Sequence, residues 1–100
     1  MYYVYILVSL VDSSLYTGQC QNVRLRLKKH NSRQVISTRR KVPWRLGYFE
    51  CFDTRREAMS RESEFKKRWN TPRKKKLIAD FDQSLIRRLL SLQGNKLPNS

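Results

Sequence analysis

Three short apolar segments, rich in β-branched and aromatic residues, predict three β-strands. They cover residues 2–10, 15–19 and 44–52. Residues 11–14, Val-Asp-Ser-Ser, have the composition of a turn, so the first two segments are expected to form an antiparallel hairpin. Pro43 directly precedes the third segment and helps to set its start.

Two capping patterns predict the first helices. Asn22 is a residue type that commonly caps a helix, and a short helix is expected to follow it as far as about His30. Thr54 with Glu57 three residues later forms a capping-box pattern, which predicts a helix from residue 54 to about residue 69. Residues 31–42 are polar and basic without apolar periodicity, which predicts a mobile loop.

The last part of the chain carries a further helix signal. Thr71 followed by Pro72 is typical of a helix start, with the threonine as N-cap and the proline at the first helical position. Apolar residues continue this helical stretch at Leu77, Ile78, Phe81, Leu85, Ile86, Leu89 and Leu90. The expected order is β-β-α-β-α-α, an α/β (α+β) fold in which helices pack on a small three-stranded antiparallel sheet.

The length of 100 residues is that of one domain. We expect this domain to occupy residues 1–92, followed by a flexible tail at 93–100.

The amino-acid composition indicates a polyanionic partner. Lys and Arg total 22 against 8 acidic residues, which gives a net charge of +14. The basic residues lie in the middle of the chain, with nine in residues 21–50 and ten in residues 51–80, and not in a tail. Nucleic acid is the expected partner. An anionic membrane is the alternative, but it would favour a basic helix with a bulky apolar face, and none is obvious.

The ends and the cysteines of the chain indicate a cytoplasmic protein. The apolar residues 1–11 lack the basic start and the cleavage site of a signal peptide, and they are too few to span a bilayer. Cys20 and Cys51 have no metal-binding spacing and are expected to be reduced, buried and structural.

One carboxylate breaks the apolar pattern of the helix predicted from residue 54. Ala58, Phe65 and Trp69 are spaced to share one helical face, and Glu62 lies among them. A carboxylate facing the core is costly unless it is paired or holds a metal ion. An ion pair with one of the arginines is therefore the structural alternative to a functional role.

Smaller irregularities lie in the first third of the chain. Arg26 and His30 are four residues apart and share one helix face. Arg26 could equally be a solvated charge that binds phosphate, and His30 could be a surface residue at the helix end. Tyrosines in strands usually form cross-strand pairs, and Gly18, two residues after Tyr16, could permit a close approach to the backbone.

Taken together, these positions resemble the GIY-YIG nuclease family. The matching elements are Tyr3-Val4-Tyr5, Tyr16-Thr17-Gly18, Arg26 with His30, Glu62 and Asn70. The chain is most similar to the small, stand-alone, UPF0213-like members, whose run of residues reads much like Arg-x-x-x-His-Asn, Arg-Glu-x-x-Phe-Lys-Lys-Arg-Trp-Asn and Lys-Lys-Leu-Ile here. The resemblance covers about residues 2–80. The chain departs from the family pattern at Tyr3, Gln19 and Arg33.

The resemblance implies metal-dependent hydrolysis of phosphodiester bonds in DNA by an activated water. Glu62 would hold one divalent cation, Mg²⁺ or Mn²⁺. One of Tyr5 and Tyr16 would activate the water, and we favour Tyr16. Arg26 would lower the pKa of a tyrosine or clamp the phosphate. His30 would orient a tyrosine or share in proton transfer.

Other residues would bind the nucleic acid without reading its sequence. Asn70 would position a phosphate or the end of the helix that carries the glutamate. The basic residues expected to follow the backbone are Arg39, Arg40, Lys41, Arg73, Lys74, Lys75 and Lys76. Two alternatives remain at this point: a non-catalytic nucleic-acid-binding module of the same fold, and a subunit that cuts only when a protein partner recruits it.

Overall fold

A three-stranded antiparallel sheet forms the centre of the molecule. The computed structural model describes residues 1–67 and 70–94. The strands are β1 (Tyr2–Ser9), β2 (Leu15–Cys20) and β3 (Trp44–Phe52), in the order β2-β1-β3. Tyr5 lies opposite Gly18 in β2 and opposite Phe49 in β3. The predicted hairpin is confirmed, and β2 and β3 are the two edges of the sheet.

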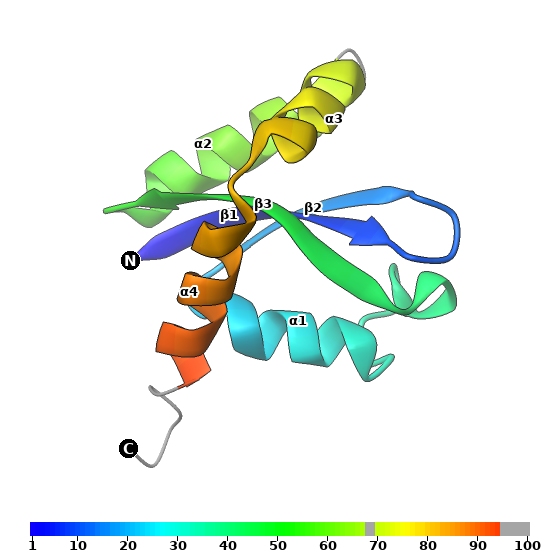
Figure 1. Ribbon diagram of the computed structural model, residues 1–100. Coiled ribbons are helices and arrows are strands. Elements are labelled where there is room, and N and C mark those ends of the chain that lie inside the picture. Colours follow the sequence, from blue (N-terminus) through cyan, green and yellow to red (C-terminus); the bar gives the residue numbers. More distant parts are fainter. Residues whose placement is uncertain (68–69, 95–100) are drawn as a thin grey trace.

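Helices cover both faces of the sheet (Figure 1). The four helices are α1 (Val23–Asn31), α2 (Arg55–Phe65), α3 (Thr71–Asp80) and α4 (Gln83–Gly94). Tyr5 and Leu7 point into the core that α1 and α4 close, whereas Val4 and Ile6 point into the core that α2 and α3 close. Because β1 is buried on both faces, its sequence is a continuous apolar run.

Two of the predicted helix starts are confirmed by their caps. The Asn22 side chain accepts a hydrogen bond from the Leu25 amide at 3.0 Å. The Thr54 hydroxyl accepts from the Glu57 amide at 3.2 Å and donates to the Glu57 carboxylate at 2.9 Å. These bonds satisfy amides that the first turn of a helix leaves without partners.

Two helix boundaries differ from the prediction. Helix α2 ends at Phe65, earlier than expected, and the predicted position of Trp69 on its apolar face lies outside the described residues. The residue before α3 is Asn70, so Thr71 is already helical and is not the cap. Pro72 lies in the first turn of α3, where its missing amide hydrogen costs nothing.

The last predicted helical stretch is two helices, which makes the order β-β-α-β-α-α-α. The helical path is interrupted at Phe81. The ring centroid of Phe81 lies 4.8 Å from that of Tyr48 and 5.2 Å from that of Phe49. The Asp82 carboxylate then accepts from the Ser84 amide at 2.8 Å, which starts α4. Gln93 lies in α4 and is buried, whereas residues 95–100 of the predicted tail lie outside the described part.

The structure corrects the expectation of a mobile loop at residues 31–42. The Asn31 side chain donates to the Trp44 carbonyl and accepts from the Trp44 amide, at 3.0 and 2.7 Å. The Trp44 indole donates to the Thr38 carbonyl at 2.9 Å. A short 3₁₀ helix, η1 (Arg39–Lys41), closes the segment. Side-chain bonds to the backbone thus replace the missing apolar contacts.

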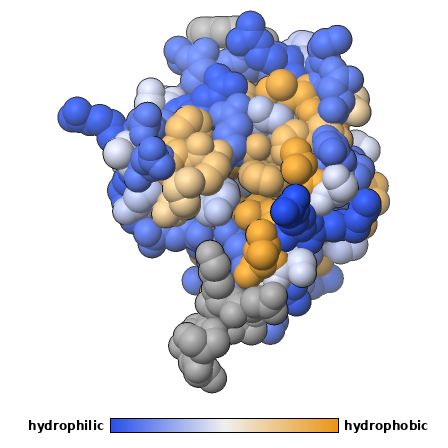
Figure 2. All heavy atoms as spheres, turned by 60° about the vertical axis from the view of Figure 1, so that its left-hand side comes forward, coloured by the Kyte–Doolittle hydropathy of each residue, from blue (hydrophilic) through white to orange (hydrophobic). Residues whose placement is uncertain are grey.

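The surface is mainly hydrophilic. Figure 2 shows one face on which hydrophilic residues surround a smaller group of apolar ones. In the described parts of the chain, every helix is too short or too polar to cross a bilayer.

Candidate active site

A buried tyrosine and the histidine form the centre of the candidate site. Tyr5 projects from β1 toward α1 and is 1% exposed, and His30, in the last turn of α1, is 0% exposed. The Tyr5 hydroxyl lies 2.9 Å from His30 Nε2. His30 Nδ1 lies 2.8 Å from the hydroxyl of Thr38, which is itself buried. The histidine is therefore held at both ring nitrogen atoms.

The hydrogen-bond pattern sets the tautomer of His30. The Thr38 hydroxyl donates its hydrogen to the Val35 carbonyl at 3.4 Å, so its oxygen is left to accept. His30 Nδ1 then carries the hydrogen and donates it to Thr38. His30 Nε2 accepts the Tyr5 hydroxyl hydrogen, which makes the imidazole a base directed at that phenol.

Arg26 and Tyr16 complete this cluster. Arg26 Nε donates to the Tyr5 hydroxyl at 3.4 Å. The Tyr16 ring lies edge-on to His30, with 5.0 Å between ring centroids, and 6.5 Å from Tyr5. The structure thus brings together Tyr5, Tyr16, Arg26 and His30, four of the residues that the family resemblance named.

Burial sets the protonation states in the cluster. It raises the pKa of the Tyr5 phenol, and the hydrogen bond and charge of Arg26 oppose this only in part. Burial, with a further contribution from the Arg26 charge, lowers the pKa of His30 to about 4. At neutral pH, Tyr5 is a phenol and His30 is neutral. The expectation that Arg26 would make a tyrosine ionise therefore does not hold for Tyr5.

Gly18 permits the close approach that its position suggested. A Cβ atom added at Gly18 would lie 2.5 Å from the Tyr5 hydroxyl oxygen and 2.7 Å from the ring carbon that carries it. Any larger residue at this position would displace the phenol. The glycine of the second triplet is thus required by the tyrosine of the first.

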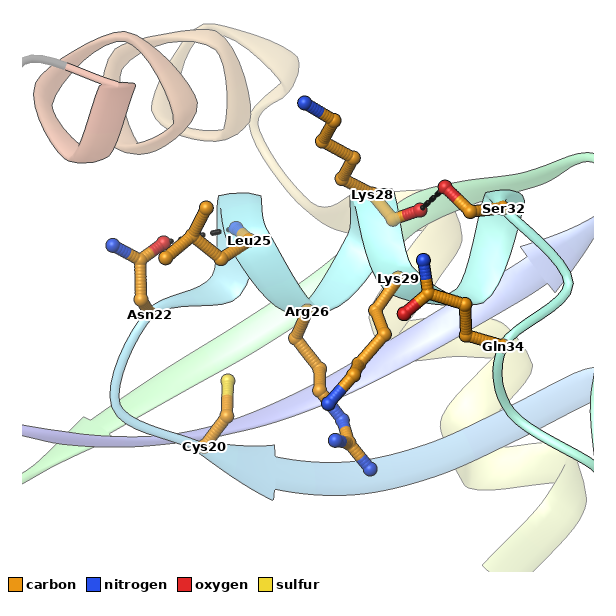
Figure 3. A pocket seen from close by; sticks show the side chains of 8 residues that line it. All are labelled: Cys20, Asn22, Leu25, Arg26, Lys28, Lys29, Ser32 and Gln34. Atoms are coloured by element: carbon orange, nitrogen blue, oxygen red, sulfur yellow. Dashed lines mark hydrogen bonds between the residues drawn. The ribbon is translucent and has the colours of Figure 1, made fainter. Parts of the chain in front are cut away.

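The open side of the cluster is a basic cavity of about 330 Å³ between α1 and the end of β2. Figure 3 shows Arg26 and Lys29 extending from α1 toward β2, with Gln34 beside them. Tyr16 is half-buried, in contrast to Tyr5. Arg26 and Tyr16 are therefore the members of the cluster that a ligand could reach.

Glu62 lies on the other face of the sheet. Helix α2 packs Ala58 and Phe65 on that face, and the Glu62 side chain is 20% exposed. Its Oε2 atom forms an ion pair with Lys66 Nζ at 3.0 Å. The ion pair expected as the structural alternative is present, with a lysine in place of an arginine. In residues 1–67 and 70–94, no three His, Cys, Asp or Glu side chains gather around a possible metal position.

Strand β2 connects the two halves of the candidate site. Tyr16 and Gly18 face the cluster around Tyr5, whereas Thr17, between them, faces α3 and is contacted by Lys74 Nζ at 3.4 Å. Because β2 is an edge strand, a ligand lying along it can reach both faces. The candidate site therefore straddles the edge of the sheet.

The other predicted residues divide by exposure. Asn70 is 3% exposed, and its amide donates to the Glu64 carbonyl at 2.6 Å, which places it for its second expected role, fixing the end of α2. Val4 is a core residue, and Tyr3 packs against Phe49. The predicted basic residues that are exposed are Arg39, Arg40 and Lys41 on η1 and Arg73, Lys75 and Lys76 on α3.

Thr38 is the site residue that the sequence did not indicate. Thr38 is 1% exposed, and its hydroxyl contacts His30, although the residue belongs to a polar segment with no periodicity. Only the path of residues 31–42 across the sheet brings it there, so no local pattern reveals it.

Comparisons with known proteins find relatives of this chain. The model of the GIY-YIG catalytic domain matches residues 1–76. A UPF0213 protein of Haloquadratum walsbyi is 45% identical over 80 residues, covering 79% of this chain and 86% of that protein. A UPF0213 protein of Bacillus licheniformis is 48% identical over 67 residues, covering 66% and 68%. The solution NMR structure of a UPF0213 protein from Bacillus halodurans is 34% identical, covers 94% of this chain and 87% of that one, and has a TM-score of 0.40.

Proposed function

We propose that this chain, which belongs to the GIY-YIG family, is a metal-dependent endonuclease that hydrolyses phosphodiester bonds in DNA. The observation that carries the proposal is the hydrogen-bonded cluster of Tyr5, His30 and Arg26, with Tyr16 beside it. Arg26 also lines a basic cavity. The net charge of +14 supports a polyanionic substrate.

A series of hydrogen bonds that starts at Thr38 and passes through His30 and Tyr5 fixes the position of the Arg26 guanidinium group. His30, held by Thr38, accepts the Tyr5 hydrogen, and the Tyr5 oxygen in turn accepts from Arg26 Nε. The terminal nitrogen atoms of Arg26 are left for the oxygens of the scissile phosphate, whose negative charge grows during the reaction. Tyr5 and His30 are therefore positioning residues.

Tyr16 is the better candidate for the base that takes the proton of the attacking water. It is the more accessible tyrosine, and Arg26 lies close enough to interact with it electrostatically. Tyr5 is almost fully buried and already donates its hydrogen to His30. This assignment predicts that Tyr16→Phe loses more activity than Tyr5→Phe.

Glu62 would hold the divalent ion through its carboxylate oxygens. Mg²⁺ and Mn²⁺ prefer oxygen ligands, keep several waters, and are commonly held by one or two carboxylates together with substrate phosphates. When bound, the ion would stabilise the charge on the transferring phosphate as a Lewis acid. In its absence, Lys66 neutralises the Glu62 carboxylate at 3.0 Å.

A cleavage panel tests the proposal. Purified protein would be incubated with supercoiled, nicked, branched and single-stranded DNA and with RNA, each with Mg²⁺ or Mn²⁺. We expect cleavage of at least one DNA form, lowered by about 100-fold or more in Arg26→Ala and Glu62→Gln, with DNA binding retained in Glu62→Gln. Arg88→Met, which removes an exposed charge on α4, serves as the matched control. Absence of cleavage of every substrate would contradict the proposal.

A non-catalytic nucleic-acid-binding module is the second candidate. The Glu62–Lys66 ion pair favours it, because a carboxylate already neutralised by lysine has a structural role. In that case the protein binds DNA with steep salt dependence, cuts none of the substrates, and binds equally well as Glu62→Gln. Cleavage that appears only after a cell extract is added would indicate a subunit recruited by a partner.

A further inference from the structure

Lys74 differs from the basic residues around it. It is 8% exposed, whereas Arg73 and Lys75 on the same helix are exposed. Helix α3 places it against β2, where its ammonium group donates to the hydroxyl of Thr17 at 3.4 Å. Lys74 therefore points at the edge strand of the candidate site, on the same face of the sheet as Glu62.

The ammonium group of Lys74 takes part in no ion pair within residues 1–67 and 70–94. Its polar contact is the neutral Thr17 hydroxyl. Burial and the positive charge of Lys66 both lower its pKa. A buried ammonium ion beside another cation costs free energy, and a bound anion would offset that cost.

A cavity of about 500 Å³ lies beside this ammonium group. Its wall consists of the β1–β2 turn, Lys41 of η1 and the start of α3, including Lys74 and Lys75. Asp12, the acid in this wall, forms an ion pair with Lys41 at 3.3 Å. The Ser14 hydroxyl and amide, with a smaller effect of Lys41, lower the pKa of Asp12 to about 2. Asp12 thus neutralises Lys41, and Lys74 and Lys75 remain as cations.

We propose that Lys74 is the cation of a second phosphate subsite, which holds a backbone phosphodiester next to the one that is cleaved. The proposal rests on the nuclease function proposed above and deepens it. The hydroxyl group of Thr71 lines the same cavity and can donate to a phosphate oxygen. The subsite lies on the Glu62 face of β2, so the substrate backbone would continue from Arg26 past the strand edge to the β1–β2 turn.

Binding measured without a metal ion tests the subsite independently of cleavage. The affinity for a short single-stranded oligonucleotide would be followed against salt concentration, in EDTA, for the wild-type protein and for Lys74→Met. Because one phosphate contact is lost, we expect the slope of log K against log salt to become shallower by about 0.7. Arg88→Met, which removes one exposed charge on the other side of the sheet, should keep the wild-type slope. A wild-type slope in folded Lys74→Met would overturn the subsite.

A second measurement uses the unaltered protein and so does not depend on the folding of a variant. The Lys74 Nζ and Cε signals would be followed by NMR in two titrations. One adds a dinucleotide, which contains one phosphodiester, and the other adds inorganic phosphate. We expect the dinucleotide to shift these signals and to raise the pKa of Lys74. No response, or a response to inorganic phosphate alone, would overturn the proposal. Failure of the cleavage panel would leave either result unchanged, so the two proposals are tested separately.

Discussion

The hydroxyl group of Tyr5 occupies the space that a side chain at Gly18 would need. The two residues face each other across β1 and β2, and a Cβ atom at Gly18 would lie 2.5 Å from the Tyr5 oxygen. The two sequence triplets are thus coupled through one contact, since the last residue of each is packed on the other. The same hydroxyl is hydrogen-bonded to His30 and Arg26, so the contact also fixes the cluster of the candidate site.

Gly18→Ala should therefore disturb both stability and activity. The added methyl group forces the buried Tyr5 ring to move, and we expect a loss of about 1–3 kcal/mol in the free energy of unfolding, measured with urea. Cleavage should fall further than stability explains, because Arg26 loses its anchor. Gly94→Ala is the control, since its Cβ would meet only the flexible guanidinium group of Arg24. Equal small effects of the two substitutions would contradict the role of this contact.

The buried neutral His30 predicts a specific pH dependence of stability. Its pKa is lowered from 6.5 to about 4 in the folded protein. Above pH 6.5 the histidine is neutral in both states, and its contribution to stability is complete. Between pH 6.5 and about 4 the unfolded chain binds a proton that the folded chain does not, so the free energy of unfolding falls as the pH falls.

Urea denaturation at pH 7, 5.5 and 4.5 checks this, with His30→Gln as the comparison. The variant should lack the part of the decline that belongs to His30, while the carboxylates titrate equally in both proteins. Nitrogen chemical shifts of His30 should also report hydrogen on Nδ1 at pH 7. Identical pH profiles, or hydrogen on Nε2, would show that the histidine is not the base directed at Tyr5.

Under the proposed function, Lys66 would compete with the divalent ion for the Glu62 carboxylate. Its ammonium group lies 3.0 Å from the Glu62 carboxylate and must move when an ion binds there. Exposed pairs of this i,i+4 type contribute about 0.3–0.5 kcal/mol, so Lys66→Met should tighten Mn²⁺ binding by roughly twofold or more. Titration calorimetry measures this, and Lys67→Met, beside it but paired with Glu64, is the control. Weaker binding in Lys66→Met would remove Glu62 as the metal ligand.

The Arg61–Glu50 pair should matter for stability and not for chemistry. Arg61 binds both carboxylate oxygens at 2.7 and 2.9 Å, Tyr48 donates to one at 2.6 Å, and the guanidinium lies over Phe65. Although burial raises the pKa of Glu50, these hydrogen bonds lower it overall. The stabilisation is therefore present above pH 4.5 and is lost as the pH falls below that value.

Arg61→Met should cost about 1–3 kcal/mol at pH 7, measured with urea, because a half-buried carboxylate loses its charged partner. Lys76→Met is the matched control. Its pair with Asp80 is exposed and 4.0 Å long, so the substitution should cost less than about 0.5 kcal/mol. Equal effects of the two substitutions would show that burial of the Arg61 pair contributes nothing.

The strands and the starts of α1 and α2 could be predicted because their signals are local. Apolar runs and capping residues such as Asn22 and Thr54 act within a few positions of the chain. Helix ends depended on distant contacts. Phe81 leaves the helical path where its ring packs on Tyr48 and Phe49, and the amide of Asn70 binds the end of α2.

The site divides in the same way. The resemblance to the GIY-YIG family grouped Tyr5, Tyr16, Arg26 and His30 before the structure showed them side by side. Thr38 reaches His30 only through the fold of an irregular segment. Lys74 belongs to a run of four basic residues, and no sequence pattern distinguishes it from the other three. Only its packing against Thr17, seen in the structure, shows that it differs.

The position of the candidate site at β2 makes the two edges of the sheet unequal. An exposed edge strand is a template for an added strand from another chain. A strand added to β2 would cover Tyr16 and Thr17 and so would block access to the candidate site. A strand added to β3, on the far edge, would leave the site open. A strand from another chain could therefore extend the sheet at β3 without covering the candidate site, whereas a strand added at β2 would block it.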